Sequence, residues 1–229
     1  MEVKKIGVLG AGIMGAGIAQ ICAEAGFEVI LVDLAETFVN KGYQNIVKNW
    51  TRAVEKGKRS AEELDRFKAL ITTSVDNNDF KDCDVVIEAI IEDIEVKKKV
   101  FKELGDICKD SAILASNTSA LSITEIAAVS GRPQSVVGMH FFNPVPVMKL
   151  VEVIPGAETS EAAVDIITEL SRKIGKEPVQ ARETPGFIVN RILVPYMNEA
   201  AMLYQEGVPA EEIDKAMKLG ANMPMGPLA

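Results

Sequence analysis

A glycine-rich turn close to the N-terminus constrains the fold of this chain more than any other stretch. An apolar run, Ile6–Leu9, is typical of a buried parallel strand, and Gly10, Gly12 and Gly15 follow it in the pattern G-x-G-x-x-G. In this pattern the first glycine permits a tight turn, the second lets a pyrophosphate approach the backbone, and the third lets the next helix pack closely on the strand. Because a helix N-terminus presents N–H groups and the positive end of a dipole, we predict a phosphate-binding turn here.

An acid at the end of the next apolar run indicates which dinucleotide would bind. The run Glu28–Val32 leads directly into Asp33, about 18 positions after Gly15 and close to the roughly 20 that separate the turn from a ribose-binding carboxylate. The Asp33 carboxylate would accept hydrogen bonds from ribose hydroxyls and repel a 2′-phosphate, and no arginine follows it directly. We therefore predict NAD as the cofactor, with Ile13 and Met14 of the turn among its contacts. A strand–helix–strand start without any ligand is the alternative.

The composition is that of a globular protein in a reducing compartment. The 229 residues are 48% apolar and 25% charged, and the net charge of −8 argues against broad nucleic-acid binding. Three scattered cysteines, Cys22, Cys83 and Cys108, form no C-x-x-C pair and are expected to be free thiols. A single histidine, His140, without a His/Cys cluster predicts no metal site. No run approaches the roughly 20 apolar residues of a membrane span, so we expect a cytoplasmic protein without a membrane contact.

The order of strand-like and helix-like segments predicts the architecture. Both kinds alternate through the first three quarters of the chain, which predicts a doubly wound, Rossmann-type parallel α/β sheet. Within it, Ser60 is expected to cap a helix, with Glu63 completing a capping box. Near Pro185 the pattern becomes wholly helical, so we predict a dinucleotide-binding domain over residues 1–183 and a short helical domain over 184–229. About 45 residues are few for an independent core, and the second domain is expected to be incomplete.

Polar side chains follow a predicted strand directly, in Ser116-Asn117-Thr118-Ser119. In a doubly wound sheet the carboxyl ends of the strands face the ligand crevice, so Asn117 and Ser119 could hold the nicotinamide ribose or a polar substrate group. A polar turn followed by a helix cap at Ser122 is the alternative.

The single histidine is a candidate for acid–base chemistry. A neutral imidazole can take a hydroxyl proton at physiological pH, which makes His140 a candidate base. Glu152 lies within the apolar run Leu150–Ile154, where an acid is costly unless it is paired. If neighbouring strands place Glu152 beside His140, the carboxylate would orient the ring and stabilise the imidazolium. A structural histidine and a solvent-facing glutamate are the alternatives.

The domain junction and a basic helix supply two further candidates. Pro185 and Gly186 predict a helix entry, and Asn190 falls about one turn in, where it could form a hydrogen bond to a substrate carbonyl or cap a neighbouring helix.

Residues 41–60 carry six cations against one acid, and Lys48, Arg52 and Lys56 share one helix face at i, i+4 spacing. This stripe could hold a phosphorylated substrate handle, or it could be a solvated face.

Four motifs together resemble the 3-hydroxyacyl-CoA dehydrogenase family, especially its bacterial 3-hydroxybutyryl-CoA dehydrogenases. These motifs are Gly10–Gln20, Ser116–Ser119, His140–Pro144 and Pro185–Arg191. The resemblance implies specific roles, with His140 as the catalytic base, Glu152 as its partner, Ser119 and Asn190 as substrate contacts, and Asp33, Glu92, Lys97, Ser119 and Asn143 as NAD contacts. Asn49 and Lys56 fall near the positions through which the family contacts CoA.

The resemblance also implies the reaction. It predicts an NAD-dependent oxidoreductase that interconverts short-chain 3-hydroxyacyl-CoA and 3-oxoacyl-CoA, such as 3-hydroxybutyryl-CoA and acetoacetyl-CoA, by hydride transfer. Two alternatives stay open, a β-hydroxyacid dehydrogenase that uses free acids and a catalytically idle NAD-binding structural protein like a lens crystallin.

The end of the sequence departs from the family pattern. Members usually continue for several dozen residues past Leu228 with helices that make most of the dimer contact, whereas this sequence ends at Ala229. We therefore expect a truncated form. The resemblance implies a homodimer for the family but leaves dimerisation of this shorter chain open.

Overall fold

An eight-stranded sheet organises the first of two units in the computed structural model, which describes residues 2–229. The units are Met1–Thr184 and Pro185–Ala229. Within residues 2–229 no helix combines the length and the apolar character needed to cross a membrane.

The sheet of the first unit is parallel except at one pair of strands. Its strand order is β3-β2-β1-β4-β5-β6-β7-β8, and β1 lies between β2 and β4. The strands are β1 Lys5–Leu9, β2 Glu28–Val32, β3 Ile71–Ser74, β4 Val85–Glu88, β5 Ile113–Ser116, β6 Val136–Phe141, β7 Leu150–Pro155 and β8 Glu177–Gln180. The Rossmann-type sheet is thereby confirmed.

The antiparallel pairing of β6 with β7 departs from the all-parallel expectation. Parallel neighbours need a crossover of a dozen or more residues, and the connection over residues 142–149 is shorter and contains no helix. The short connection therefore reverses the chain, and the register then sets His140 directly opposite Glu152.

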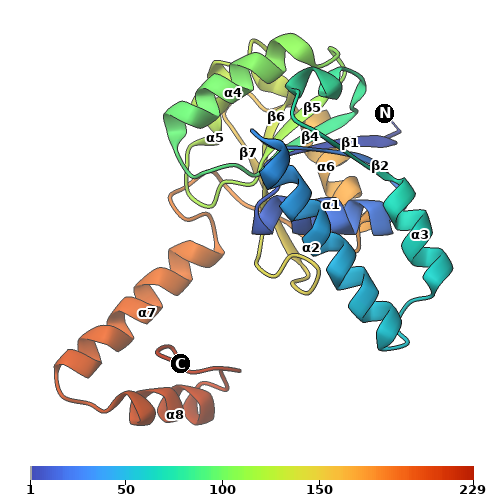
Figure 1. Ribbon diagram of the computed structural model, residues 1–229. Helices are drawn as coiled ribbons and strands as arrows, with labels where there is room; N and C mark the ends of the chain where they lie inside the picture. Colours follow the sequence, from blue (N-terminus) through green and yellow to red (C-terminus); the bar gives the residue numbers. More distant parts are fainter. Residues whose placement is uncertain (1) are drawn as a thin grey trace. The chain divides into compact units, whose positions relative to one another are not determined.

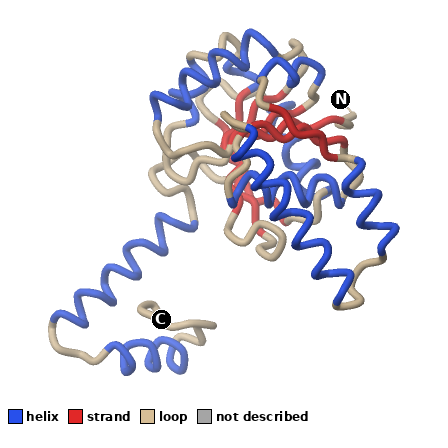
Figure 2. The backbone as a smooth tube through the Cα atoms, viewed as in Figure 1, coloured by secondary structure: helices blue, strands red, loops and turns tan. Residues whose placement is uncertain are grey.

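Helices cover both faces of this sheet. Figures 1 and 2 show the strands in a central layer, with α1 and α6 on one face and α4 and α5 on the other. The helices are α1 Ile13–Glu24, α2 Glu36–Glu55, α3 Ala61–Ala69, α4 Ile94–Ile107, α5 Ile123–Ala128 and α6 Glu161–Lys173, with short 3-10 helices at Asn77–Asp82 and Pro133–Ser135. Because both faces are covered, the central strands are buried on both sides, as in Val85–Glu88 and Val136–Phe141, whose residues are all buried.

Local sequence signals set several helix ends. The predicted capping box of α3 is confirmed, since Ser60 Oγ accepts from the Glu63 N–H at 3.2 Å and Glu63 Oε2 accepts from the Ser60 N–H at 2.9 Å. Ser122 caps α5 by accepting from the Glu125 N–H, so the capping role considered for Ser122 is also present.

The second unit contains helices α7 (Val189–Gln205) and α8 (Ala210–Gly220). Ala200 is the buried residue of α7 and Ile213 that of α8. Large apolar side chains remain exposed along α7, including Ile192, Leu193, Val194, Met202, Leu203 and Tyr204. A pair of helices offers too few facing positions to cover all of this surface, which agrees with the small size of the unit.

Candidate active site

The glycine-rich turn joins β1 to α1 in a conformation that needs its glycines. Gly10 has φ +99°, in the left-handed region, and a Cβ at Gly15 would lie 1.7 Å from the Gly10 carbonyl oxygen. A Cβ at Gly12 would instead meet no described atom within 4 Å, so the backbone here faces open space. Gly12 is also the N-cap of α1 and has no side chain to occupy the helix N-terminus. An anionic group can therefore approach these N–H groups closely.

Asp33 holds this turn from the end of β2. Its Oδ2 accepts from the Ala11 N–H at 2.7 Å, and its Oδ1 accepts from the Leu34 N–H at 2.7 Å. The carboxylate thus lies beside the turn, where a dinucleotide ribose would follow the phosphates.

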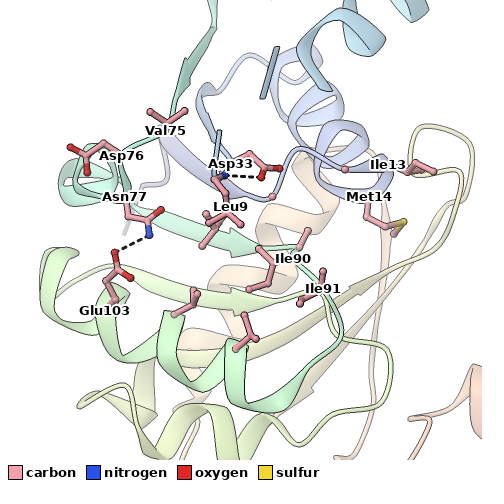
Figure 3. Close-up of a pocket in the computed structure, with 16 residues that line it drawn as sticks. Leu9, Ile13, Met14, Asp33, Val75, Asp76, Asn77, Ile90, Ile91 and Glu103 are labelled. Atoms are coloured by element: carbon pink, nitrogen blue, oxygen red, sulfur yellow. Dashed lines mark hydrogen bonds between the residues drawn. The ribbon is translucent and has the colours of Figure 1, made fainter. Parts of the chain in front are cut away.

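A cavity of about 650 Å³ opens above the turn. Figure 3 shows Val75 and Asp76 toward one end, Ile13 and Met14 toward the other, and Asp33 between them. Its lining comprises Leu9, Gly10, Gly12, Ile13, Met14, Asp33, Leu34, Val75, Asp76, Asn77, Ala89, Ile90, Ile91, Val96, Val100 and Glu103. A long, largely apolar cavity with a carboxylate and an open helix N-terminus fits an adenosine-containing dinucleotide.

A second cavity, of about 340 Å³, continues from the first. The two share Met14, Ala89 and Ile90. The second cavity brings together many of the predicted site residues, since its lining includes Glu92, Asn117, Ser119, His140 and Asn143, together with Phe141 and Phe142. Residues from β4, β5 and β6 meet here because these strands all end at the same edge of the sheet.

His140 and Glu152 form a buried pair at this cavity. His140 Nδ1 lies 2.8 Å from Glu152 Oε2, and the two residues are 5% and 0% exposed. A solvent-facing Glu152 is therefore excluded. Since a ring nitrogen that bonds a carboxylate is held in one orientation, the pair is suited to proton transfer through the other ring nitrogen.

Glu92, which lines the same cavity as His140, is held by several hydrogen bonds. Glu92 Oε1 accepts from Thr118 Oγ1 at 2.6 Å and from the Ser119 N–H at 2.8 Å and its Oγ at 3.0 Å. Burial alone raises the pKa of Glu92, but these hydrogen bonds and the nearby Lys97 charge outweigh it and leave the pKa below its usual range. Glu92 therefore holds the chain at Ser119 as a carboxylate.

Lys97 is enclosed by acids rather than lining either cavity. Its Nζ lies 2.5 Å from Glu88 Oε1 and 3.5 Å from Glu92 Oε2, and Lys97 and Glu88 are 1% and 0% exposed. Glu88 also accepts from Ser116 Oγ at 2.7 Å and from the Ile90 N–H at 2.8 Å. Sequence reasoning missed Glu88, although an acid at the end of the apolar run Val85–Glu88 is the same signal that identified Glu152.

Replacing Lys97 with methionine is expected to lower the free energy of unfolding by about 3–5 kcal/mol, because it leaves the Glu88 charge buried without its cation. Denaturant unfolding of the variant and the wild type measures the loss. Lys98→Met is the matched control, since Lys98 is the next residue on α4 and its partners Glu95 and Glu125 are exposed. Equal losses of unfolding free energy in Lys97→Met and Lys98→Met would contradict the stabilising role of the buried pair of Lys97 and Glu88.

Asn117 connects two strand ends at the cavity. Its Oδ1 accepts from the Phe141 N–H at 2.9 Å, and its own N–H donates to the Glu88 carbonyl at 2.8 Å. Asn117 therefore fixes the end of β6, one residue after His140.

The residues expected near CoA lie on the outer helix α2 or directly after it, and neither lines either cavity. Asn49 is exposed and donates to Gln20 Oε1 at 3.0 Å, and Lys56 lies just past the end of α2. A separate groove along α2 is lined by Lys48 and Arg52 with Lys68 of α3. Asn190 is the second residue of α7 (Val189–Gln205), in the second unit, so it lies at the start of the helix and not about one turn in.

Two models of one protein family match the chain. The NAD binding domain of 3-hydroxyacyl-CoA dehydrogenase matches residues 5–184, and the C-terminal domain of 3-hydroxyacyl-CoA dehydrogenase matches residues 186–229.

Individual relatives agree with these matches. The chain is 50% identical to a 3-hydroxybutyryl-CoA dehydrogenase of Clostridioides difficile over 98% of this chain and 80% of the relative. It is 50% identical to a probable 3-hydroxybutyryl-CoA dehydrogenase of Bacillus subtilis over 100% of this chain and 80% of the relative. The crystal structure of (S)-3-hydroxybutyryl-CoA dehydrogenase from Ralstonia eutropha matches with a TM-score of 0.96 at 44% identity, covering 99% of this chain and 80% of that one.

Proposed function

Because this chain belongs to the 3-hydroxyacyl-CoA dehydrogenase family, we propose that it interconverts short-chain 3-hydroxyacyl-CoA and 3-oxoacyl-CoA with NAD as its cofactor. The observation that carries the proposal is the buried pair of His140 and Glu152, 2.8 Å apart at a cavity that adjoins the glycine-rich turn. The similarity to 3-hydroxybutyryl-CoA dehydrogenases supports a four-carbon acyl group.

We assign the adenosine and pyrophosphate of the cofactor to the first cavity and its nicotinamide end to the second. The N–H groups at Gly12, Ile13 and Met14 would hold the pyrophosphate, and the missing side chain of Gly12 would allow its approach, while Gly10 and Gly15 shape the turn. Asp33 would bind the adenosine ribose, and its charge would oppose the 2′-phosphate of NADP. Bound there, NAD would supply the nicotinamide that exchanges a hydride with the substrate.

We assign the proton transfer of this reaction to His140. During oxidation the imidazole takes the proton of the 3-hydroxyl group while C3 loses a hydride and the C3–O bond becomes a carbonyl. During reduction the same imidazole returns the proton to the developing alkoxide. The Glu152 carboxylate holds Nδ1, so the exchange is assigned to Nε2, and its negative charge stabilises the imidazolium.

Other predicted residues are assigned binding roles. Ser119 and Asn190 would contact the hydroxyl and the thioester carbonyl, and Asn117, Asn143 and Glu92 would border the nicotinamide end. Glu92 already holds Ser119 by two hydrogen bonds, so it sets the position of that contact. The Lys97 side chain is enclosed and would act on the cofactor site only through Glu92, whose Oε2 lies 3.5 Å from the Lys97 Nζ. Asn49 and Lys56 would meet the CoA moiety from α2.

A comparison of the rates with CoA-linked and with free substrate tests the proposal. We expect NADH oxidation with acetoacetyl-CoA to exceed that with free acetoacetate by about 100-fold or more in kcat/KM, since binding energy from the remote CoA handle contributes to transition-state stabilisation. NADPH is the matched cofactor control and should be used poorly because of Asp33. Comparable rates with free acetoacetate would favour a β-hydroxyacid dehydrogenase. NADH binding without turnover of either substrate would favour a structural role.

A further inference from the structure

We infer that Lys176 is a positioning residue for this reaction, because its buried ammonium group clamps the segment that connects His140 to Glu152. This clamped segment covers residues 142–149 and carries Phe142 and Asn143 to the smaller cavity. The inference rests on the proposed function for its catalytic consequence. The clamp itself is a structural statement that can be measured without any turnover.

The end of α6 places Lys176 under the clamped segment. Gly175 has φ +77°, which ends the helix in the left-handed conformation, and the Lys176 N–H bonds back to the Ser171 carbonyl at 2.9 Å. The chain then enters β8, where the Glu177 N–H donates to the Lys149 carbonyl at 2.8 Å. Lys176 is therefore held between a helix end and a strand start, directly beside the end of the segment.

The Lys176 ammonium bonds two carbonyl groups of the clamped segment. Its Nζ donates to the carbonyl oxygen of Val145 and, at 2.8 Å, to that of Met148, and the residue is only 6% exposed. A buried ammonium is costly unless hydrogen bonds replace its hydration. Here the two carbonyls supply those bonds, so the charge and the shape of the segment stabilise each other.

The segment closes on itself between those two carbonyls and packs on α1. The N–H groups of Val147 and Met148 both donate to the Pro144 carbonyl, at 2.9 and 3.0 Å. Val145 is 2% exposed and lies against Gly17 of α1, where an added Cβ would come within 2.8 Å of the Val145 Cβ. The clamped segment is thus fixed to the helix that begins at the glycine-rich turn.

The other end of the segment reaches the proposed catalytic pair. The Phe142 ring packs against the His140 ring with a centroid distance of 4.5 Å and an interplanar angle of 51°. Asn143, the next residue, lines the same cavity. Without the ammonium, two inward-facing carbonyls would lose their donor, and the segment would relax toward water. Phe142 and Asn143 would then lose the positions that His140 and the cofactor need.

Lys176→Met tests the clamp with two independent readouts. Hydrogen exchange of the Val147 and Met148 amides is expected to accelerate at least about tenfold, because the turn they close is no longer anchored. The kcat with acetoacetyl-CoA is expected to fall about 10- to 100-fold, as small displacements of positioning groups do. Lys173→Met is the matched control, since Lys173 lies on the same helix in a surface pair with Glu169, and it should change neither readout.

Rescue separates positioning from a general loss of stability. Lys176→Arg keeps a cationic donor and is expected to retain kcat within about fivefold of wild type. Lys176→Ala is expected to recover part of its kcat on addition of propylammonium, which can occupy the vacated space and donate to the same carbonyls. A folding defect would not respond to the amine.

The outcomes distinguish the clamp from the proposed function. Faster exchange together with lower kcat supports the inference, whereas unchanged exchange in Lys176→Met overturns the clamp. Faster exchange with wild-type kcat overturns the positioning role. Faster exchange in a protein whose wild type does not reduce acetoacetyl-CoA would support the clamp and contradict the proposed function.

Discussion

Replacing His140 with alanine is expected to lower kcat for acetoacetyl-CoA reduction by about 10²- to 10⁴-fold, the range that a positioned acid–base group contributes. The ring is the group assigned to transfer the proton, and His140 is the single histidine of the chain, so no second imidazole can substitute. The Kd for NADH, measured by fluorescence, should stay within about threefold, because the larger cavity, assigned to the adenosine and the pyrophosphate, is not lined by His140.

The comparison of kcat with NADH affinity is the control for this variant. A methyl group in place of a buried ring leaves a space beside Phe142, so the unfolding midpoint is measured in parallel. Equal losses of turnover and NADH affinity would contradict the catalytic role and indicate a folding defect.

Replacing Glu152 with glutamine is expected to lower kcat by about 100-fold with little change in NADH affinity. The amide preserves the size of the side chain and can still accept from Nδ1, but it removes the charge that stabilises the imidazolium. Steady-state kinetics with acetoacetyl-CoA measures the effect. Because Glu152 acts through His140, the double variant with His140→Ala should be no slower than His140→Ala alone.

Glu158→Gln is the matched control, since Glu158 is an exposed acid a few residues further along the chain. It is expected to retain wild-type kcat. Additive losses of kcat in the double variant of His140→Ala and Glu152→Gln would contradict the pairing, since the effects of two residues that act as one unit do not add.

Predictions from local patterns succeeded where the cause is local. The apolar run Ile6–Leu9, typical of a buried strand, lies in β1, and Ser60 with Glu63 caps α3 as expected. The family predicted from four motifs and the NAD-binding domain are confirmed by the matching models. For the strand, the cap and each single motif, a short window of residues contains the whole physical signal.

Features that depend on distant segments were harder to predict. The reversal at β7 follows from the length of one connection, yet it decides that His140 faces Glu152 across a strand pair. The apolar run that contains Glu152 indicated a buried, paired acid, and the structure places it against His140. The site roles of these residues remain predictions.

The buried cations show the limit of sequence reasoning most clearly. Lys97 and Lys176 resemble surface lysines in the sequence, and their burial comes from partners 9 and 31 positions away, Glu88 and Val145. Asn49 is similar, since its hydrogen bond to Gln20 spans 29 positions. Such partners are brought together only by the packed fold, so no local pattern identifies them.

The most direct test of the proposed chemistry is a crystal structure of the protein with NAD⁺ and acetoacetyl-CoA, a pair that cannot exchange a hydride. The decisive measurement is the distance from His140 Nε2 to the C3 oxygen of the acyl group. We expect a hydrogen bond of about 2.6–3.2 Å, with Glu152 still bound to Nδ1. A C3 oxygen held by another side chain, beyond the reach of His140, would contradict the assignment of the proton to this residue.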